Sequence, residues 1–233
     1  EVPVAGESMK DIFDDFRQII LPGMTHWQSP NFFAYFPANS SYPSVLAEML
    51  TVTMGAQAMK WETSPAATEL EEKVMNWLKK MTGLPDEFHG VIQDTASTAT
   101  LTAILNARER ASGYSVNEQG FGKTERFRVY CSTETHSSIE KAVKIAGLGS
   151  RNLVKVGTDS QFRLDPALLQ QAIEADLVSG LTPVCVVVTL GTTAAGSFDP
   201  LPEILKLREK YGFRIHADAA YGGYFTLAET LVP

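Results

Sequence analysis

The strongest constraint on the fold is an alternation of short apolar segments with amphipathic ones from residue 127 onward. The apolar segments have the length of strands, and the segments between them place apolar residues at helical spacing. Strands that are apolar throughout are buried on both faces. The pattern therefore predicts an α/β fold, with a mostly parallel sheet and helices on both of its faces. The predicted strands are residues 127–131, 153–156, 184–190 and 214–217, and the predicted helices between them are residues 138–146, 166–178 and 200–211.

The N-terminal half is predicted to be mainly helical. An aromatic stretch, WQSPNFFAYFPANSSYP, follows the first helix and is expected to form an ordered loop with buried rings. Ser64 and Pro65 are a typical N-cap and first helical residue for the third helix. A short strand is expected at Val91–Ile92, and the polar residues 113–126 are expected to form a surface loop. The predicted helices are residues 10–20, which end before the breaker Pro22-Gly23, and residues 43–59, 65–81 and 97–111.

Composition favours small-molecule chemistry. A net charge of −7 and a pI near 5.2 argue against a nucleic-acid partner, because a phosphate backbone attracts clustered lysine and arginine. The only two cysteines, Cys131 and Cys185, lie in apolar strands and are expected to be reduced, as in the cytoplasm. No apolar run approaches the roughly 18 residues of a membrane span, so no membrane partner is expected.

Polar residues follow several predicted strands, where ligands bind in open α/β sheets. After Val91–Ile92 comes QDTASTATL, in which Thr95, Ala96 and Ser97 open a helix and could bind a phosphate through free N–H groups. A serine N-cap without any ligand is the alternative. His136 lies in the turn after the strand at 127–131, where a structural hydrogen bond is the alternative to a catalytic role.

Thr189 and Asp218 end the last two predicted strands. An acid at the end of a buried strand is costly unless something pairs with it. One ligand accounts for a phosphate site, a ring-stacking residue and an acid together, namely pyridoxal 5'-phosphate. A carboxylate beside its pyridine nitrogen keeps that nitrogen protonated, and the protonated ring then withdraws electrons from the attached amino acid.

Six blocks in order resemble the group II pyridoxal-phosphate-dependent amino-acid decarboxylases, and within them the aromatic-L-amino-acid decarboxylases. The blocks are LPGMTHWQSPNFFAYFPANSSYPS, SPAATELE, QDTASTATL, THSSIEKA, TLGTTAAGSFDPL and HADAAYGG. The resemblance implies the large domain of a fold type I enzyme, truncated, in residues 43–233, preceded by part of a helical N-terminal segment in residues 1–42. It also implies a homodimer with active sites at the subunit interface, and decarboxylation of an aromatic L-amino acid to its amine and carbon dioxide.

The resemblance also implies a role for individual residues. Asp218 would bind the ring nitrogen and His136 would stack on the ring, and both are the expected catalytic residues. The expected cofactor-binding residues are these two with Thr95, Ala96, Ser97, Thr189 and Ala220. The expected substrate-binding residues are Trp27, Tyr35, Phe36 and Pro37. Filling of an ordinary core is the alternative for these aromatic side chains.

The family binds its cofactor through a lysine in a histidine-lysine pair, and no such pair occurs in these 233 residues. Because the chain also begins with Glu1 and stops at Pro233, it is expected to be a piece of a longer enzyme and to be inactive alone. Ala38 stands where animal members of the family carry threonine, and the stretch MGAQAMKW differs from its counterpart in them. The contributions of Gln57 and Met59 to the pocket, and the identity of the aromatic acid, are therefore left open. Some members of the family release an aldehyde by an oxidative route, and this outcome is the alternative to amine formation.

Two readings from other classes have less support. His216-x-Asp218 could supply two ligands of an iron oxygenase, but no histidine follows Asp218 and the alternating pattern is not that of a double-sheet β fold. Gly122-Lys123-Thr124 resembles the end of a phosphate loop, but Asn117 stands where the leading glycine belongs.

Overall fold

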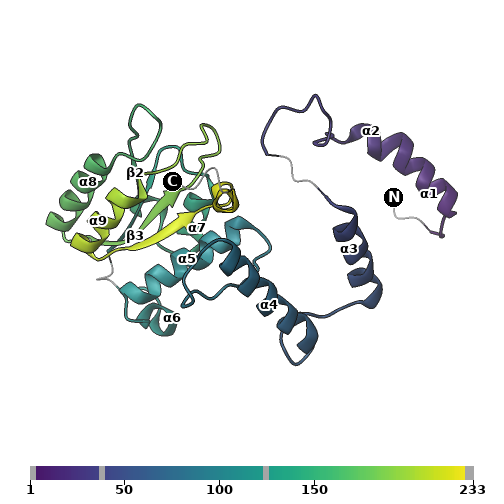
Figure 1. Ribbon diagram of the computed structural model, residues 1–233, viewed down its shortest axis with the longest axis horizontal. Helices are drawn as coiled ribbons and strands as arrows, with labels where there is room; N and C mark the ends of the chain where they lie inside the picture. Colours follow the sequence, from purple (N-terminus) through teal and green to yellow (C-terminus); the bar gives the residue numbers. More distant parts are fainter. Residues whose placement is uncertain (1–3, 37–39, 123–125, 229–233) are drawn as a thin grey trace. The chain divides into compact units, whose positions relative to one another are not determined.

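The computed structural model describes residues 4–36, 40–122 and 126–228, and the chain divides into two compact units (Figure 1). The first unit comprises residues 1–56 and the second comprises residues 57–233. The division at residue 42 that the sequence suggests concerns functional segments, and it stays a prediction.

The first unit consists of short helices. They are α1 (Met9–Asp15), the π-helix η1 (Phe16–Ile20), α2 (Leu21–Gly23) and α3 (Tyr42–Met54). The prediction that Pro22-Gly23 stops the first helix at Ile20 is wrong by three residues. A π-helical turn precedes the proline, with the Leu21 N–H bonded to the Phe16 carbonyl, and such a turn accommodates a residue that cannot join the α-helical hydrogen bonds.

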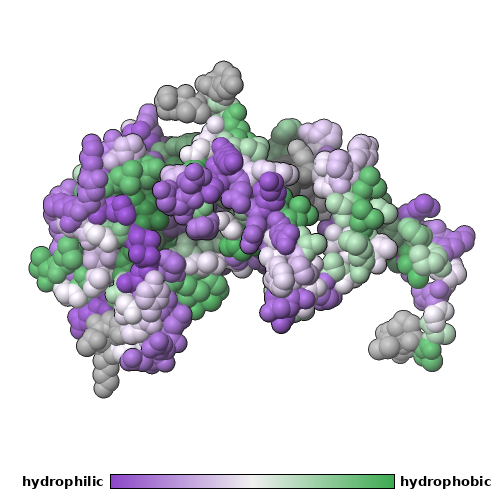
Figure 2. Space-filling view, turned by 60° about the horizontal axis from the view of Figure 1, so that its bottom comes forward, coloured by the Kyte–Doolittle hydropathy of each residue, from purple (hydrophilic) through white to green (hydrophobic). Residues whose placement is uncertain are grey.

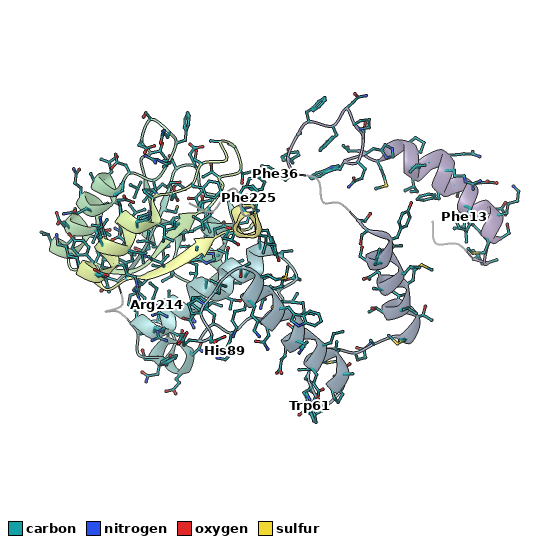
Figure 3. All side chains as sticks on the ribbon, viewed as in Figure 1. Phe13, Phe36, Trp61, His89, Arg214 and Phe225 are labelled. Carbon is teal, nitrogen blue, oxygen red and sulfur yellow. The ribbon has the colours of Figure 1, made fainter. Side chains whose placement is uncertain are left out.

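α3 ends five residues earlier than predicted, because Gly55 adopts φ +58° and ends it in the left-handed conformation. None of the described residues in these helices is buried. Their apolar side chains are exposed instead, as with Phe13 on α1 (Figure 3) and the hydrophobic surface of this unit in Figure 2.

The second unit is an α/β layer structure, and the predicted α/β class is confirmed. Apart from Val91–Ile92, α6 and two 3-10 turns, its elements lie within two residues of the predicted ones. Its helices are α4 (Pro65–Met81), α5 (Ala96–Ala111), α6 (Ser115–Gln119), α7 (Ser138–Ile145), α8 (Pro166–Val178) and α9 (Leu201–Tyr211), with 3-10 turns η2 (Ser150–Asn152) and η3 (Gly222–Leu227). Its strands are β1 (Phe127–Ser132), β2 (Leu153–Val156), β3 (Thr182–Thr189) and β4 (Arg214–Asp218).

The four strands form one parallel sheet in the order β2-β1-β3-β4. The chain moves from β1 outward to β2, crosses back to β3, and then moves outward again to β4. The direction of winding therefore reverses between β1 and β3, and ligands of doubly wound sheets bind beside such a reversal at the carboxyl ends of the strands.

Alternate residues of β3 face opposite layers of the core. Cys185 and Val187 pack with Ile104 of α5 and Val143 of α7, whereas Val186 and Val188 belong to the cluster that contains Leu169, Ile173 and Ile204 of α8 and α9. Helices α5 and α7 thus cover one face of the sheet, and α8 and α9 cover the other (Figure 1). Burial on both faces explains why β3 is apolar almost throughout.

Two local predictions are wrong. Val91 and Ile92 are not in a strand and are 62% and 59% exposed; the Ile92 N–H donates to Glu71 Oε1 at 2.8 Å instead of to a neighbouring strand. Residues 113–126 are not entirely loop, because the short helix α6 lies within them and buries Val116. Lys123 and Thr124, of the segment that resembles a phosphate loop, lie outside the described residues.

Candidate active site

The carboxyl end of the sheet brings together residues that the sequence singled out. Thr189 and Asp218 are the last residues of β3 and β4 and pair with each other in the parallel register. His136 lies in the turn between β1 and α7, beside the reversal of winding. Thr95 immediately precedes α5, the helix that contacts both β3 and β4. These residues come from four segments, and all of them lie at the carboxyl end of the sheet.

Thr189 and Asp218 also share a face of the sheet. Thr189 follows Cys185 and Val187 at the spacing of two residues that keeps side chains on one face, so it lies on the side of α5 and α7. His216 of β4 contacts Thr100 of α5, and Asp218 is two residues further along that strand. Both side chains therefore lie on the α5 side of the sheet.

The Asp218 carboxylate is weakly engaged. Its hydrogen bond is with the Ala220 N–H, at 3.4 Å from Oδ1, and it joins none of the salt bridges of the described residues. The residue is half-buried. A carboxylate in this position can accept a hydrogen bond from a cationic group of a ligand, and such charge-assisted bonds are about twice as strong as neutral ones.

Thr189 is buried, and its Oγ1 has no hydrogen-bond partner among the described residues. Its backbone is held firmly, because the Thr189 N–H donates to Asp199 Oδ2 at 2.7 Å. A buried hydroxyl without a partner is rare in proteins, and this one can bond to a ligand atom that reaches the end of β3.

Asp199 is a residue that sequence reasoning missed. Only 4% exposed, it accepts a second backbone hydrogen bond, from the Leu164 N–H to Oδ1 at 2.7 Å. Burial raises the pKa of its carboxyl, and the two hydrogen bonds oppose that rise. The available signal was an acid directly before Pro200 and the next helix, downstream of a buried strand.

The first turn of α5 offers free N–H groups. Thr95 is the N-cap, and it forms a capping box in which the Thr98 N–H donates to Thr95 Oγ1 at 3.3 Å. The N–H groups of Ala96 and Ser97 have no partner in the described parts of the chain. Since the expected serine cap is taken by Thr95 instead, Ser97 is free to contribute its N–H and hydroxyl to an anion.

His136 is exposed but its ring is oriented. Nδ1 accepts the Ser138 N–H at 3.2 Å and lies 2.9 Å from Ser138 Oγ. Because Nδ1 is the acceptor, the neutral ring carries its proton on Nε2. His136 therefore does make the structural hydrogen bond that the sequence allowed as an alternative, and the face of its ring stays available for stacking.

The aromatic residues of the first unit form a stack. Trp27 stacks on Tyr35 with ring centroids 5.3 Å apart and planes at 10°, and on Phe32 with centroids 5.2 Å apart. Tyr35 has a positive φ of 59°, an uncommon conformation for a residue other than glycine. Phe36 is half exposed (Figure 3), and Pro37 lies outside the described residues. The exposure of these rings contradicts the expectation of an ordered loop with buried rings.

An apolar hollow lies on the opposite face of β4. It has a volume of about 840 Å³ and is lined by Ile215, Ala217 and Ala219 of the β4 segment and by apolar side chains of α9 and α4. None of the predicted cofactor residues lines it, so the hollow and the cluster at the strand ends are distinct. No group of three or more potential metal ligands occurs among the residues that the structure describes.

Residues 1–232 match the family model described as "Pyridoxal-dependent decarboxylase conserved domain". The chain belongs to this family. Tryptophan decarboxylase 2 of Oryza sativa subsp. japonica is 43% identical over 229 residues, which are 95% of this chain and 45% of the relative. Aromatic-L-amino-acid decarboxylase of Bos taurus is 43% identical over 233 residues, which are 95% of this chain and 47% of the relative. The solved structure of Rhodiola rosea 4-hydroxyphenylacetaldehyde synthase superimposes with a TM-score of 0.91 and 39% identity, covering 99% of this chain and 50% of the other.

Family membership confirms the expected cofactor, pyridoxal 5'-phosphate, and the expected fold. The residues at the strand ends fit this group on three observations: the free N–H groups of Ala96 and Ser97 suit its phosphate, the unpartnered Thr189 hydroxyl suits a polar ring substituent, and the weakly engaged Asp218 carboxylate suits its ring nitrogen.

The chain spans about half the length of the curated relatives it matches. Among the described residues, no helix is both long and apolar enough to cross a bilayer.

Proposed function

We propose that this chain is the cofactor-binding part of an enzyme that decarboxylates an aromatic L-amino acid to the corresponding amine and carbon dioxide. The proposal is supported above all by the convergence of Asp218, Thr189 and the start of α5 on one face of the sheet at its carboxyl end. Membership of the pyridoxal-dependent decarboxylase family supports the reaction class.

In this proposal the N–H groups of Ala96 and Ser97 bind the phosphate at the positive end of α5. The Asp218 carboxylate holds a proton on the pyridine nitrogen, and the Thr189 hydroxyl donates to a polar atom of the ring. His136 covers one ring face, while Ala220 leaves room for the ring beside β4. When bound, the cofactor supplies an electron sink for the bond that breaks at the α-carbon.

The charge on Asp218 is the main electrostatic contribution of the described residues. Withdrawal of electrons toward the ring nitrogen is favourable only while that nitrogen is protonated, and a carboxylate at hydrogen-bonding distance stabilises the protonated form. The stabilisation is preorganised, because β3 pairing fixes Asp218 before any ligand arrives.

We further propose that the aromatic residues of the first unit contact the side chain of the substrate. The residues proposed for this contact are Trp27, Tyr35, Phe36 and Pro37. The rings of Trp27, Tyr35 and Phe36 are partly exposed, and each contact between rings is worth about 0.5–1.5 kcal/mol beyond the buried area. Members of the family named for tryptophan and for other aromatic acids are compatible with this choice but do not fix the substrate.

We also propose that the whole enzyme is a homodimer, and that the amine that holds the cofactor covalently comes from outside residues 1–233, because no histidine-lysine pair occurs in them. The 233-residue chain alone is then expected to bind pyridoxal phosphate weakly and to release no amine. Amine release by this chain alone would contradict the proposed source of the lysine.

The test is an assay of the full-length protein with tryptophan, tyrosine, DOPA and phenylalanine, in which amine, carbon dioxide, aldehyde and oxygen consumption are all measured. Equal amounts of amine and carbon dioxide without oxygen uptake are the expected result. Absence of carbon dioxide from all four acids would contradict the proposal.

Aldehyde synthesis is the second candidate, because the solved Rhodiola rosea 4-hydroxyphenylacetaldehyde synthase shares the fold at 39% identity. That outcome would appear in the same assay as aldehyde, with one oxygen molecule consumed for each carbon dioxide released.

Asp218→Asn in the full-length protein tests the role of the carboxylate. Turnover is expected to fall about 10²–10³-fold, the typical cost of removing one preorganised electrostatic group from a site. Asp165→Asn is the matched control. The Asp165 side chain caps α8 by accepting hydrogen bonds from two backbone N–H groups, and an asparagine side chain can accept the same bonds. Turnover within about twofold of the wild type for Asp218→Asn would remove the proposed role.

A further inference from the structure

A hydrogen bond between Thr100 and His216 joins the two elements that carry opposite ends of the candidate site. Thr100 Oγ1 and His216 Nε2 are 3.2 Å apart, although the residues are 116 positions apart in the sequence. Thr100 is 2% exposed and His216 is half-buried. The bond is therefore an interior contact between α5 and β4.

The bond lies at similar depth below both ends of the site. Thr100 is one helical turn after Ala96, a rise of about 6 Å along α5. His216 is two residues before Asp218, a rise of about 6.6 Å along β4. The first turn of α5 and the Asp218 carboxylate thus belong to two elements, α5 and β4, that are joined by a hydrogen bond about 6 Å along each element from them.

The contact can hold α5 and β4 at a fixed distance from each other. A buried hydroxyl or imidazole that loses its partner carries a desolvation cost, so the two side chains resist separation. Burial lowers the pKa of His216, and the negative charge of Asp218 opposes that shift. The imidazole is therefore neutral at neutral pH, where one of its nitrogens donates and the other accepts.

We propose that Thr100 and His216 are positioning residues that set the distance between the phosphate-binding turn of α5 and the carboxylate of Asp218. This inference rests on the proposed function. A ligand gains from the fixed distance only if it engages both ends at once, through a phosphate and through a ring nitrogen. The pair would thereby favour the phosphorylated cofactor over the same ring without a phosphate.

A purely structural contact makes a different prediction, which allows a clear test. Loss of stability alone would weaken all ligands of the site to the same extent. Loss of spacing would weaken a ligand with two anchors and leave a ligand with one anchor almost unchanged. Pyridoxal 5'-phosphate has both anchors, and pyridoxal lacks the phosphate.

The experiment measures dissociation constants of both compounds for the full-length apoenzyme and for its Thr100→Val variant. Valine has nearly the shape of threonine without the hydroxyl. The affinity for pyridoxal 5'-phosphate is expected to fall about tenfold, the typical scale for one buried hydrogen bond, while that for pyridoxal stays within about twofold. Thr100→Ser keeps the hydroxyl and is expected to restore the preference for the phosphorylated compound.

Thr102→Val is the matched control on the same helix. Its hydroxyl is exposed and donates to the Thr98 carbonyl at 2.9 Å, away from β4. No change in either affinity is expected for this variant. If Thr100→Val does not fold, His216→Gln is measured in its place, with the same expected loss.

Equal losses for the two compounds, or no loss for either, would contradict the positioning role. A wild-type protein that binds no pyridoxal 5'-phosphate would instead contradict the proposed function itself, and this inference with it. The two failures are thus distinguished by the wild-type measurement.

Discussion

At the residue scale, two polar side chains at the carboxyl end of the sheet have hydrogen-bonding capacity that the rest of the described protein does not use. Thr189 Oγ1 is unpartnered within the described structure, and Asp218 has one long hydrogen bond. Their neighbour Asp199, in contrast, accepts two backbone hydrogen bonds of 2.7 Å. The difference separates a residue that holds the backbone from residues that are ready to contact a ligand.

His216 gives a prediction about pH. Its pKa in the folded protein lies below the ordinary value of 6.5, so between the two values the unfolded chain binds a proton that the folded protein does not. The free energy of unfolding of the apoenzyme should therefore fall as the pH is lowered through 6.5. This part of the pH dependence is expected to be missing in His216→Gln.

Urea denaturation of both proteins at pH 5, 6 and 7 measures the effect. Well above pH 6.5, His216 is neutral in both the folded and the unfolded protein. The difference in free energy of unfolding between wild type and variant should therefore be constant there. A difference that does not change from pH 7 to pH 5 would show that His216 titrates normally in the folded protein.

Sequence reasoning located some site residues better than others. Thr189 and Asp218 could be found because a polar residue that ends an apolar strand is visible in the sequence. The Thr100–His216 contact could not, since 116 positions separate the two residues and no motif contains both. Asp199 was overlooked because its partners are backbone N–H groups, which leave no trace in the identity of Thr189 or Leu164.

At the element scale, a buried ion pair fixes the far end of α5. Glu109 accepts from Arg108 Nη2 at 2.7 Å and from the Asn117 N–H of α6 at 3.0 Å, and Arg108 also donates to the Ala146 carbonyl at the end of α7 at 2.7 Å. Three helices thus meet at two charged side chains that are nearly inaccessible to solvent.

Glu109→Ala should be strongly destabilising. The substitution leaves the Arg108 guanidinium buried without its carboxylate, and breaking a buried pair on one side costs about 3–5 kcal/mol. Chemical denaturation of the variant measures this loss. Glu118→Ala on the exposed side of α6 is the control, with an expected change below about 0.5 kcal/mol. A loss below about 1 kcal/mol for Glu109→Ala would mean that the pair contributes little.

The elements that the sequence predicted well are those with an unbroken apolar period. β2 and α8 have the predicted bounds, because each is flanked by residues that cannot continue it. Val91–Ile92 has the composition of a strand, yet a strand needs a neighbour, and the sequence does not show whether one is present. The end of α3 was misplaced because the apolar period continues to Met59 past Gly55, whose left-handed conformation decides the matter.

At the scale of the whole molecule, the two units differ in how much they bury. The second unit has two apolar clusters, one on each face of its sheet. The first unit has no buried residue in its described helices, and its longest helix has 13 residues. Helices of that length are marginal in water without packing.

A peptide of residues 1–56 is therefore expected to lack a cooperative fold. Its helical signal in circular dichroism should be weak and should decline gradually on heating, whereas residues 57–233 should show a sigmoidal transition. A sharp thermal transition of the peptide at low concentration, where it is monomeric, would contradict this expectation.

Family membership and the arrangement of the strand ends together explain the main features of the molecule: a parallel sheet whose winding reverses beside His136, free N–H groups at the start of α5, and an acid at the end of β4. The central claim is that the acid at residue 218 pairs with a protonated ring nitrogen, and turnover measurements report on it only indirectly.

The most direct test is nitrogen NMR of the full-length protein loaded with pyridoxal 5'-phosphate labelled with ¹⁵N in the ring. The wild-type spectrum is expected to show a protonated ring nitrogen at neutral pH, and Asp218→Asn is expected to shift the signal to that of the unprotonated ring. An unprotonated nitrogen in the wild type, or a protonated one that persists in Asp218→Asn, would contradict the claim.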